Sequence, residues 1–406
     1  MEGQNNRRRF LKHFFSLLAF GSASLLSFKK NKGLKMGKPG SIGMSSSGAQ
    51  TIDNSVSGMK KITIEEYFTT ESLLDYLRSR IKAGAKYKCL FDYNSEQLLS
   101  GGIIPGQRLK DMDEAGIDMQ VISALPWHEG LVNPSEGTAM ARMTNDEIYR
   151  ITEQNPKRYA GFAALACQDP KAAANEFERA VKELGLKGAM IYSHIQGEYL
   201  DAQKFWPVFE KAEELDVPIY IHPKGMPSSG LEPYLDYGLW GASWGFAADT
   251  GLHAMRLISS GLFDKYPDLK IILGHGGEGL PYWLHRIGMG DARPQGGAPA
   301  PAPDGAQPQG GASAPVLAGT KIPRALCKKR PGEYVKTNFY VTTSGMFWEP
   351  VLMFIHSVLG PDRILFAVDY PAGSNIAGVR SIESLPLSNE DKGKIFHLNT
   401  EKLLRM

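Results

Sequence analysis

Short apolar runs alternate with amphipathic stretches along the chain from residue 60 onward. Several runs are apolar at successive positions, which is typical of strands in a parallel sheet covered by helices. The eight predicted strands are Lys61–Ile64, Asp118–Ser123, Tyr159–Leu165, Lys187–Tyr192, Val217–Ile221, Leu269–Leu273, Phe339–Thr343 and Arg363–Val368. Between them, helical periodicity occurs at Lys171–Leu184, Ala202–Leu215, Thr250–Leu262 and Trp348–Val358.

Eight strand–helix units predict an α/β fold, a closed (β/α)8 TIM-type barrel over residues 60–406. A doubly wound open sheet would show the same alternation and is the structural alternative. Of the 406 residues, 42% are hydrophobic and 22% charged, so the chain can bury a large core. This composition excludes a wholly disordered or fibrous protein.

The N-terminal segment has a different pattern from the rest. Residues 6–12 read NRRRFLK and are followed by an uncharged, mostly apolar run from Phe14 to Phe28, which is the layout of an export signal. The pair Arg7 and Arg8 resembles a twin-arginine signal, so we expect residues 1–40 to direct a folded protein to the periplasm and residues 41–59 to form a linker. An uncleaved N-terminal membrane anchor and a basic amphipathic helix are the alternatives.

A second segment also lacks helix or strand periodicity. Between Pro294 and Pro315, seventeen of 22 residues are Gly, Pro or Ala. Such a composition buries too little apolar surface to order itself, so we expect a disordered low-complexity insertion at residues 294–320, on the surface of the barrel.

Charge and cysteine content exclude some classes of function. The net charge is +3, but residues 1–38 contain nine Lys or Arg and one Glu, so the remainder is mildly acidic. A body without a basic stripe argues against nucleic-acid binding. The three cysteines, an odd number without a close pair, indicate neither a disulfide framework nor a thiolate zinc site.

Ionisable residues follow four of the predicted strands. They are Glu65 and Glu66 after the first, His222 after the fifth, His275 after the sixth with Glu278 three residues later, and Asp369 after the eighth. Each alone has an ordinary explanation as a hydrogen-bonding residue, a helix cap or a turn former. In a closed barrel, however, the carboxyl ends of all strands meet at one mouth, where active sites are built. Two imidazoles and two carboxylates there suit a divalent metal, zinc or manganese first and magnesium as the alternative.

The residues around these positions resemble a known family. The segments are Ile64–Phe68, Ile221–Pro223, Trp244–Ala247, Gly251–Arg256, Ile272–Pro281, Thr342–Gly345 and Arg363–Pro371. They are similar to those of the amidohydrolase-related (amidohydrolase 2) metal-dependent decarboxylases, in particular the γ-resorcylate and 2,3-dihydroxybenzoate decarboxylases. The resemblance covers residues 61–290 and 334–404.

The resemblance implies a barrel that binds its metal through Glu65, His222 and Asp369. It also implies that His275 and Glu278 contact the substrate or assist proton transfer, and that Arg286 helps to hold the acid group of the substrate. Relatives of this kind are commonly dimers or tetramers.

The sequence departs from the family pattern near two of these positions. Many relatives have His two residues after the first ligand, where this chain has Tyr67. A phenol with a pKa near 10 is a poor metal ligand, so we interpret Tyr67 as a pocket wall or hydrogen-bond donor. An Asp that often follows Arg-Ile is Gly288 here, directly before the insertion, which affects the surroundings of Arg286.

The expected activity is non-oxidative decarboxylation of a hydroxylated aromatic acid. Asp369 is the candidate proton donor, because protonation of the ring carbon lets CO2 leave as aromaticity returns; His275 and Glu278 would resupply the proton. A small aromatic acid is thus the expected partner, and Phe68, Trp244, Phe246 and Tyr67 are candidates for the walls of its pocket.

Two alternative functions use the same residues. A metal-bound water could hydrolyse an amide or lactone, although the first strand offers Glu65 and Tyr67 instead of a His-x-His pair. A barrel without metal could simply bind an aromatic acid. The presence of Glu65, His222, His275 and Asp369 in one chain favours an enzyme.

Overall fold

The computed structural model of the protein describes residues 58–87, 102, 106–289 and 325–406. The predicted export signal, nearly all of the predicted linker and the predicted insertion lie outside the described residues. Among the described helices, none combines the length and the apolar character needed to cross a membrane.

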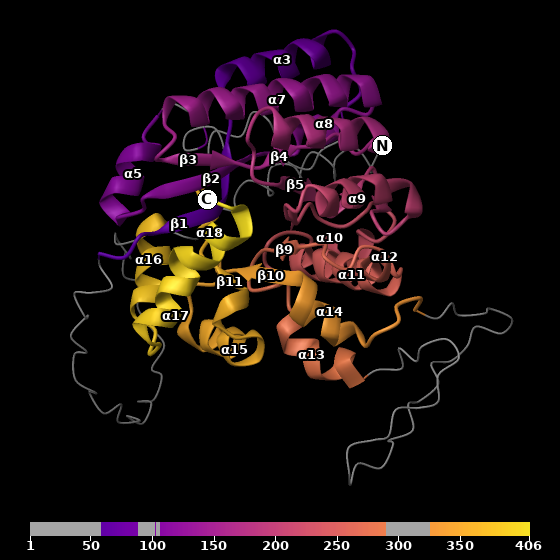
Figure 1. Ribbon diagram of the computed structural model, residues 1–406. Helices are drawn as coiled ribbons and strands as arrows, with labels where there is room; N and C mark the ends of the chain where they lie inside the picture. Colours follow the sequence, from indigo (N-terminus) through magenta and orange to yellow (C-terminus); the bar gives the residue numbers. More distant parts are fainter. Residues whose placement is uncertain (1–57, 88–101, 103–105, 290–324) are drawn as a thin grey trace, which may run out of the picture. The chain divides into compact units, whose positions relative to one another are not determined.

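The strands form a closed parallel barrel (Figure 1). In order around it they are β1 (Ile62–Phe68), β2 (Met119–Ala124), β3 (Tyr159–Gly161) with β4 (Ala163–Ala164), β5 (Ala189–Tyr192), β8 (Ile219–His222), β9 (Ile271–Leu273), β10 (Phe339–Thr342) and β11 (Ile364–Leu365). Phe162 joins the two sheets by donating its N–H to the carbonyl of Ile122 at 3.0 Å. The N–H of Ile64 donates to the carbonyl of Phe366 at 3.1 Å and closes the ring. Each predicted strand is confirmed, and the open-sheet alternative is wrong because β1 and β11 are not free edges.

Helices surround the barrel. Those between the strands are α3 (Glu71–Lys82), α5 (Arg108–Ala115), α6 (Trp127–Gly130), α7 (Pro134–Gln154), α8 (Pro170–Lys182), α9 (Trp206–Glu214), α10 (Glu232–Leu235), α11 (Gly245–Ser259), α12 (Leu262–Lys265), α13 (Leu280–Met289), α14 (Pro331–Asn338) and α15 (Glu349–Leu359). After β11 come α16 (Asn375–Glu383), α17 (Asn389–Gly393) and α18 (Asn399–Leu404). The four predicted helices correspond to α8, α9, α11 and α15. A short antiparallel hairpin, β6 (His194–Ile195) with β7 (Glu198–Tyr199), follows β5.

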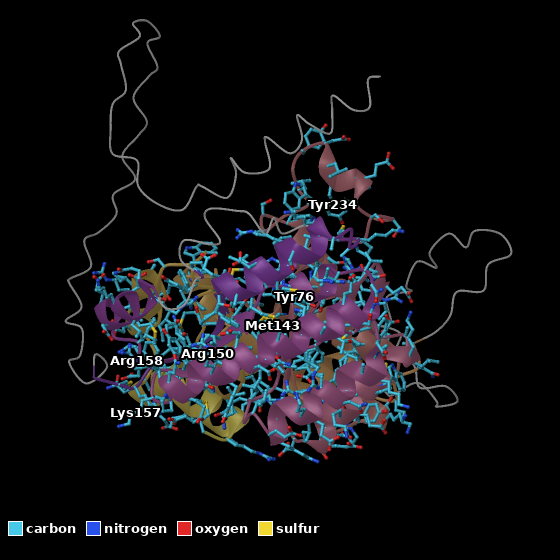
Figure 2. The ribbon with its side chains drawn as sticks, turned by 90° about the horizontal axis from the view of Figure 1, so that it is seen from above. Tyr76, Met143, Arg150, Lys157, Arg158 and Tyr234 are labelled. Carbon is cyan, nitrogen blue, oxygen red and sulfur yellow. The ribbon has the colours of Figure 1, made fainter. Side chains whose placement is uncertain are left out.

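The longest described helix, α7, was not predicted. Figure 2 views it from outside, with Met143 and the exposed Arg150 labelled along it. Its buried face includes the polar Thr144 and Asn145, which weakens the apolar periodicity. Asn145 bonds both backbone groups of Ala164 in β4, donating to the carbonyl at 3.1 Å and accepting the N–H at 2.7 Å. The side chain therefore acts as a hydrogen-bonding neighbour of the strand, a role that periodicity does not reveal.

Two apolar cores follow from the alternation along each strand. The larger contains Ile219, Ile221 and many helix residues, so it lies between the strands and the helices. The smaller contains strand residues such as Ile64, Tyr67 and Tyr220, so it fills the barrel interior. The site described next lies at the end of this interior core, where the strands reach their carboxyl termini.

Candidate metal centre

Glu65 and Glu66 lie within β1, and the prediction that they follow the first strand is wrong, because this strand continues to Phe68. The register of β1 against β2 shifts between Ile64 and Glu66, which makes Glu65 the extra residue of a β-bulge. Its φ of 76° is left-handed. A bulge re-aims side chains, so Ile64 and Glu65 both reach the interior while Glu66 faces outward.

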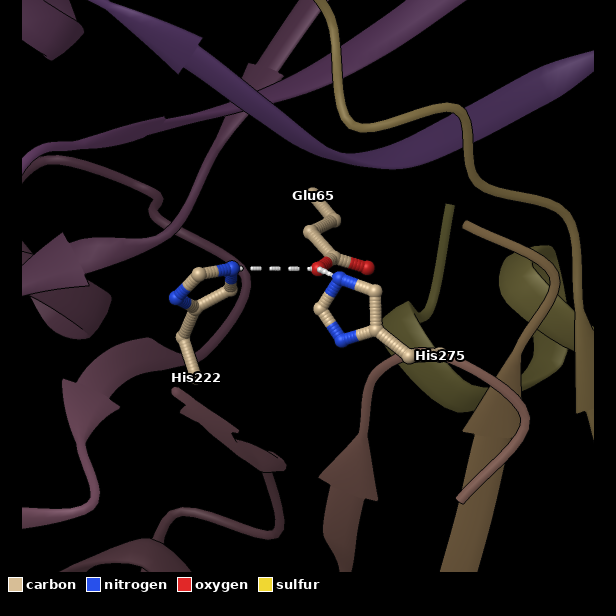
Figure 3. A group of neighbouring side chains, drawn as sticks. All are labelled: Glu65, His222 and His275. Atoms are coloured by element: carbon tan, nitrogen blue, oxygen red, sulfur yellow. Dashed lines mark ion pairs between the residues drawn. The ribbon is translucent and has the colours of Figure 1, made fainter. Parts of the chain in front are cut away.

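Three side chains converge at the mouth of the barrel (Figure 3). Glu65 Oε1 lies 3.2 Å from Nε2 of His222, at the end of β8, and 3.4 Å from Nε2 of His275, two residues after the end of β9. One ligand atom from each lies within 4.8 Å of the others, which is the spacing of a metal-binding group. The ligand set expected from the sequence has Asp369 in place of His275.

The orientation of these groups fits a divalent cation. Glu65 Oε1 is buried and accepts no hydrogen bond, whereas Oε2 accepts one from the Tyr220 hydroxyl and one from Thr342 Oγ1 at 3.0 Å. His222 Nδ1 lies 2.8 Å from the carbonyl of Pro223 and can donate to it, so that the Nε2 lone pair faces the Tyr67 hydroxyl and Glu65 Oε1, where a metal could take it. A Cβ added to Gly274 would lie 3.0 Å from Glu65 Oε1, so a glycine leaves the room this oxygen needs.

Charge is balanced within the cluster. Burial alone would raise the pKa of the Glu65 carboxyl, but the neighbouring His275 and His222 lower this pKa to about 2. Burial acts to lower the pKa of His275, yet the carboxylates of Glu65 and Glu278 raise it well above its usual value. Nδ1 of His275 lies 2.8 Å from Glu278 Oε1. Glu65 thus stays ionised and can bind a cation, and His275 is able to carry a proton.

Asp369 lies beside this group. Its Oδ2 is 3.9 Å from His275 Nε2, and its Oδ1 is buried without a hydrogen bond. Burial raises the pKa of the Asp369 carboxyl, although His275 opposes the shift. A carboxyl of this kind can exchange a proton with its histidine neighbour.

The backbone of the site is unusual as well. Seven non-glycine residues of the described chain have a left-handed φ, and four of them are Glu65, His275, Glu278 and Asp369. Such a conformation costs about 1–3 kcal/mol per residue and persists where the surroundings enforce it, which is common at active sites.

The comparisons with known proteins agree with this geometry. The sequence model of the Amidohydrolase family (Amidohydro_2) matches residues 97–406. The chain belongs to this family. The γ-resorcylate decarboxylase of Polaromonas sp. is 35% identical over 355 residues, which cover 85% of this chain and 98% of that protein.

Solved structures of other proteins resemble this chain over nearly the same residues. The 5-carboxyvanillate decarboxylase of Novosphingobium aromaticivorans, with bound manganese, is 35% identical, with a TM-score of 0.74 over 86% of this chain and 98% of that one. The 2,6-dihydroxybenzoate decarboxylase from Rhizobium is 31% identical, with a TM-score of 0.71 over 86% and 99%. The (β/α)8 barrel is therefore shared with these proteins, and Glu65, His222 and His275 form a group that could hold a metal ion.

Tyr67 contacts the centre of the amidohydrolase site directly. Its hydroxyl lies within hydrogen-bonding distance of His222 Nε2, and the two rings meet edge to face with centroids 5.2 Å apart. Burial, followed by the charge of Asp369, raises the pKa of the phenol well above its usual value. Tyr67 is therefore a neutral hydrogen-bonding group beside His222.

Other residues predicted to bind substrate are not brought to the cluster. Phe68 is 1% exposed and belongs to the outer core, because it alternates with Tyr67 along β1; as a pocket wall it is a wrong prediction. Trp244 is 60% exposed at the start of α11, and Phe246 packs on Trp240. Arg286 is exposed on α13. Within the described residues, no hydrogen bond or ion pair joins the last three to the cluster.

Sequence reasoning missed the residues that hold Glu65. Tyr220 and Thr342 contact its Oε2, and Thr342 Oγ1 lies 2.8 Å from Ser344 Oγ, which in turn accepts the N–H of His275 at 3.1 Å. The available signal was weak: Tyr220 lies between two isoleucines of an apolar strand, two residues before His222. A hydroxyl in the interior of a barrel indicates a buried partner that needs it.

Proposed function

We propose that this member of the Amidohydrolase family is a carboxy-lyase, which removes CO2 from a hydroxylated aromatic acid without oxidation. The observation that carries the proposal is the open Oε1 of Glu65 facing two imidazoles at the barrel mouth. Decarboxylases of γ-resorcylate and 5-carboxyvanillate, 35% identical to this chain, support the substrate class.

Glu65 and His222 are the proposed principal ligands, and Asp369 Oδ1, free of hydrogen bonds, completes the set. His275 Nε2 lies within the same reach. Manganese is the proposed ion, because the Novosphingobium enzyme binds it; imidazole and carboxylate ligands also suit zinc. The bound ion supplies positive charge that can hold the phenolate and carboxylate oxygens of a substrate.

Asp369 and His275 are the proposed path of the proton. Asp369 with a raised pKa keeps a proton that it can give to the ring carbon bearing the carboxylate. A C–H bond forms, the C–C bond to the carboxylate breaks, and its electron pair restores the aromatic ring as CO2 leaves. His275 Nε2, 3.9 Å from Asp369 Oδ2, returns a proton to Asp369. Glu278 bonds the other ring nitrogen, Nδ1, of His275.

Incubation of manganese-loaded protein with a panel of hydroxybenzoates and simple amides tests the proposal. We expect CO2 release from an ortho-hydroxylated acid and no amide hydrolysis. Hydrolysis without CO2 would favour the hydrolase alternative, and binding without turnover would favour a binding protein.

Asp369→Asn should abolish turnover while an aromatic acid still binds. A near-normal rate would contradict the assignment of the proton donor.

Export is a separate proposal, supported by the NRRRFLK sequence and the apolar run after it. Cell fractionation should find the protein in the periplasm or attached to the membrane facing it. Replacing Arg7 and Arg8 together by lysine should retain it in the cytoplasm. Unchanged distribution of that variant would contradict a twin-arginine route.

Assembly into a homo-oligomer, a dimer or tetramer, is also proposed. Three neighbouring aromatic residues are exposed on α13 and α15: Tyr282 is 70%, Trp283 49% and Phe354 39% accessible. Their rings contact one another, with centroids 5.1 Å and 6.3 Å from that of Tyr282. Exposed apolar patches commonly mark interfaces. Light scattering should give a multiple of the 44.6 kDa chain mass, and a monomer at micromolar concentration would contradict it.

A further inference from the structure

Glu66 is the second residue of the Glu65–Glu66 pair, and it faces away from the metal centre. Its carboxylate is fully buried. Oε1 accepts the N–H of Val368 at 3.1 Å, and Oε2 accepts the N–H of Tyr370 at 2.8 Å. These two N–H groups lie on either side of Asp369, so one carboxylate bridges the turn that presents the proposed proton donor.

The turn needs such a support. Asp369 has a φ of 69°, in the left-handed region that a residue with a Cβ adopts at a cost. Holding the N–H of Val368, one peptide before that of Asp369, and the N–H of Tyr370, directly after Asp369, restrains the backbone conformation of Asp369. Two further backbone bonds help: the N–H of Tyr67 donates to the carbonyl of Tyr370 at 2.8 Å, and the N–H of Gly373 donates to that of Asp369 at 2.7 Å.

Arg108 of α5 lies behind this arrangement and provides the opposite charge. It is 1% exposed, donates to Gln120 Oε1 at 2.9 Å and to the carbonyl of Tyr67, and its guanidinium lies 4.6 Å from the centroid of the Tyr370 ring. Glu66 and Arg108 thus lie on opposite sides of the same segment, Glu66 bonding its backbone N–H groups and Arg108 stacking on the Tyr370 ring. Arg108 therefore contacts both segments that the Glu66 carboxylate joins, β1 through Tyr67 and the turn after β11 through Tyr370.

We propose that Glu66, backed by Arg108, is a positioning residue that holds Asp369 in its left-handed conformation beside His275. The effect on catalysis rests on the proposed function, whereas the effect on the turn does not. Glu66→Gln separates the two. A glutamine has one acceptor oxygen and an NH2 group that cannot accept, so the N–H of Val368 or of Tyr370 loses its partner.

The test measures amide hydrogen exchange in peptides spanning residues 366–370, together with kcat and KM. In Glu66→Gln we expect exchange of the Val368 and Tyr370 amides to accelerate at least about 10-fold, and kcat to fall by about 10–100-fold with little change in KM. Glu66→Asp keeps a carboxyl group but has a shorter side chain, so we expect an intermediate kcat. This variant replaces the glutamine variant in the test if the latter folds poorly.

Glu176→Gln is the matched control. Glu176 is also a buried glutamate, 3% exposed, and it bonds Arg142, Arg179 and Asn145 away from the barrel mouth. It should lower the melting temperature without altering exchange at residues 366–370 or the ratio of kcat to KM. Unchanged exchange in Glu66→Gln, or a kcat within about twofold of the parent, would overturn the inference. If the parent itself released no CO2, the proposed function would fail while exchange still decided the role of Glu66 in the turn.

Discussion

The two oxygens of the Glu65 carboxylate have different partners. Oε2 is taken by the hydroxyls of Tyr220 and Thr342, whereas Oε1 is left open towards the imidazoles. Groups that orient a ligand in this way contribute to metal affinity although they do not touch the ion. The arrangement leaves a single oxygen of Glu65 free for the metal.

Tyr220→Phe removes one of these donors without changing the volume of the side chain much. We expect manganese affinity, measured by competition with a chelator, to fall about 10-fold or more, because Oε2 then competes for the ion and the carboxylate can rotate. Tyr334→Phe is the control, since Tyr334 is 1% exposed and donates to Asp264 at 2.5 Å, remote from the centre. Equal affinities in the two variants would contradict the orienting role.

Tyr67→His tests what the phenol next to His222 does. An imidazole there would add a lone pair beside Nε2 of His222, so we expect tighter retention of manganese during dialysis. Tyr67→Phe removes the hydroxyl alone and should leave metal retention close to that of the parent. Weaker retention in the histidine variant would show that the side chain at position 67 does not reach the ion.

At the level of residues, the sequence predicted which ionisable side chains lie together better than which aromatic side chains lie near them. Glu65, His222, His275 and Asp369 were found because they lie at or just beyond the ends of apolar strands, a position that topology alone brings together. Phe68 was misplaced because neighbouring strand residues face opposite sides, and the bulge that decides which side has no marker in the sequence.

Among the elements, α11 has polar side chains that serve packing. His253 is fully buried, and its Nε2 accepts the N–H of Leu200 at 3.2 Å. Arg256 on the same helix makes two bonds of 2.8 Å to Asp201. Both side chains attach the helix to the segment after β7, as expected of structural residues.

The burial of His253 has a pH consequence. Burial, with His194 and Arg256, lowers the pKa of His253 from 6.5 to about 3. Between pH 6.5 and 3, His253 is therefore protonated in the unfolded chain and neutral in the folded chain. The free energy of unfolding should therefore fall with acidification from pH 6.5 towards 3, by up to about 1.4 kcal/mol per pH unit from this residue. Urea unfolding of His253→Gln between pH 7 and 4.5 should show a slope shallower by that amount. The exposed His285 supplies the control His285→Gln, whose slope should match the parent.

The strands were easier to predict from the sequence than helix α7 and the β6–β7 hairpin. All eight strands appeared as apolar runs, because both faces of each strand are buried in this fold. The helix α7 did not, since its buried face uses Asn145 to bond β4. The hairpin β6–β7 is too short to produce a periodic pattern.

For the whole molecule, the insertion is expected to be dispensable. Before the gap the described chain ends with α13, and after it the N–H of Leu326 donates to the carbonyl of Ser259 at 2.7 Å. Loop length changes closure entropy only slowly, so removing residues 294–315 should alter the free energy of unfolding by less than about 1 kcal/mol. Melting temperature and manganese affinity of the shortened protein check this. A tenfold loss of metal affinity would show that the segment contributes to the site.

The closure of the barrel by β1 and β11 has a consequence for synthesis. The bond between Glu66 and the N–H of Val368 spans 302 positions, and Glu65 needs a partner strand made equally late. During synthesis, the side of β1 that faces β11, with Glu66, therefore stays without its partner until residues 364–370 have been made. We therefore expect Asp369 to join Glu65, His222 and His275 only after the β11 segment has been translated.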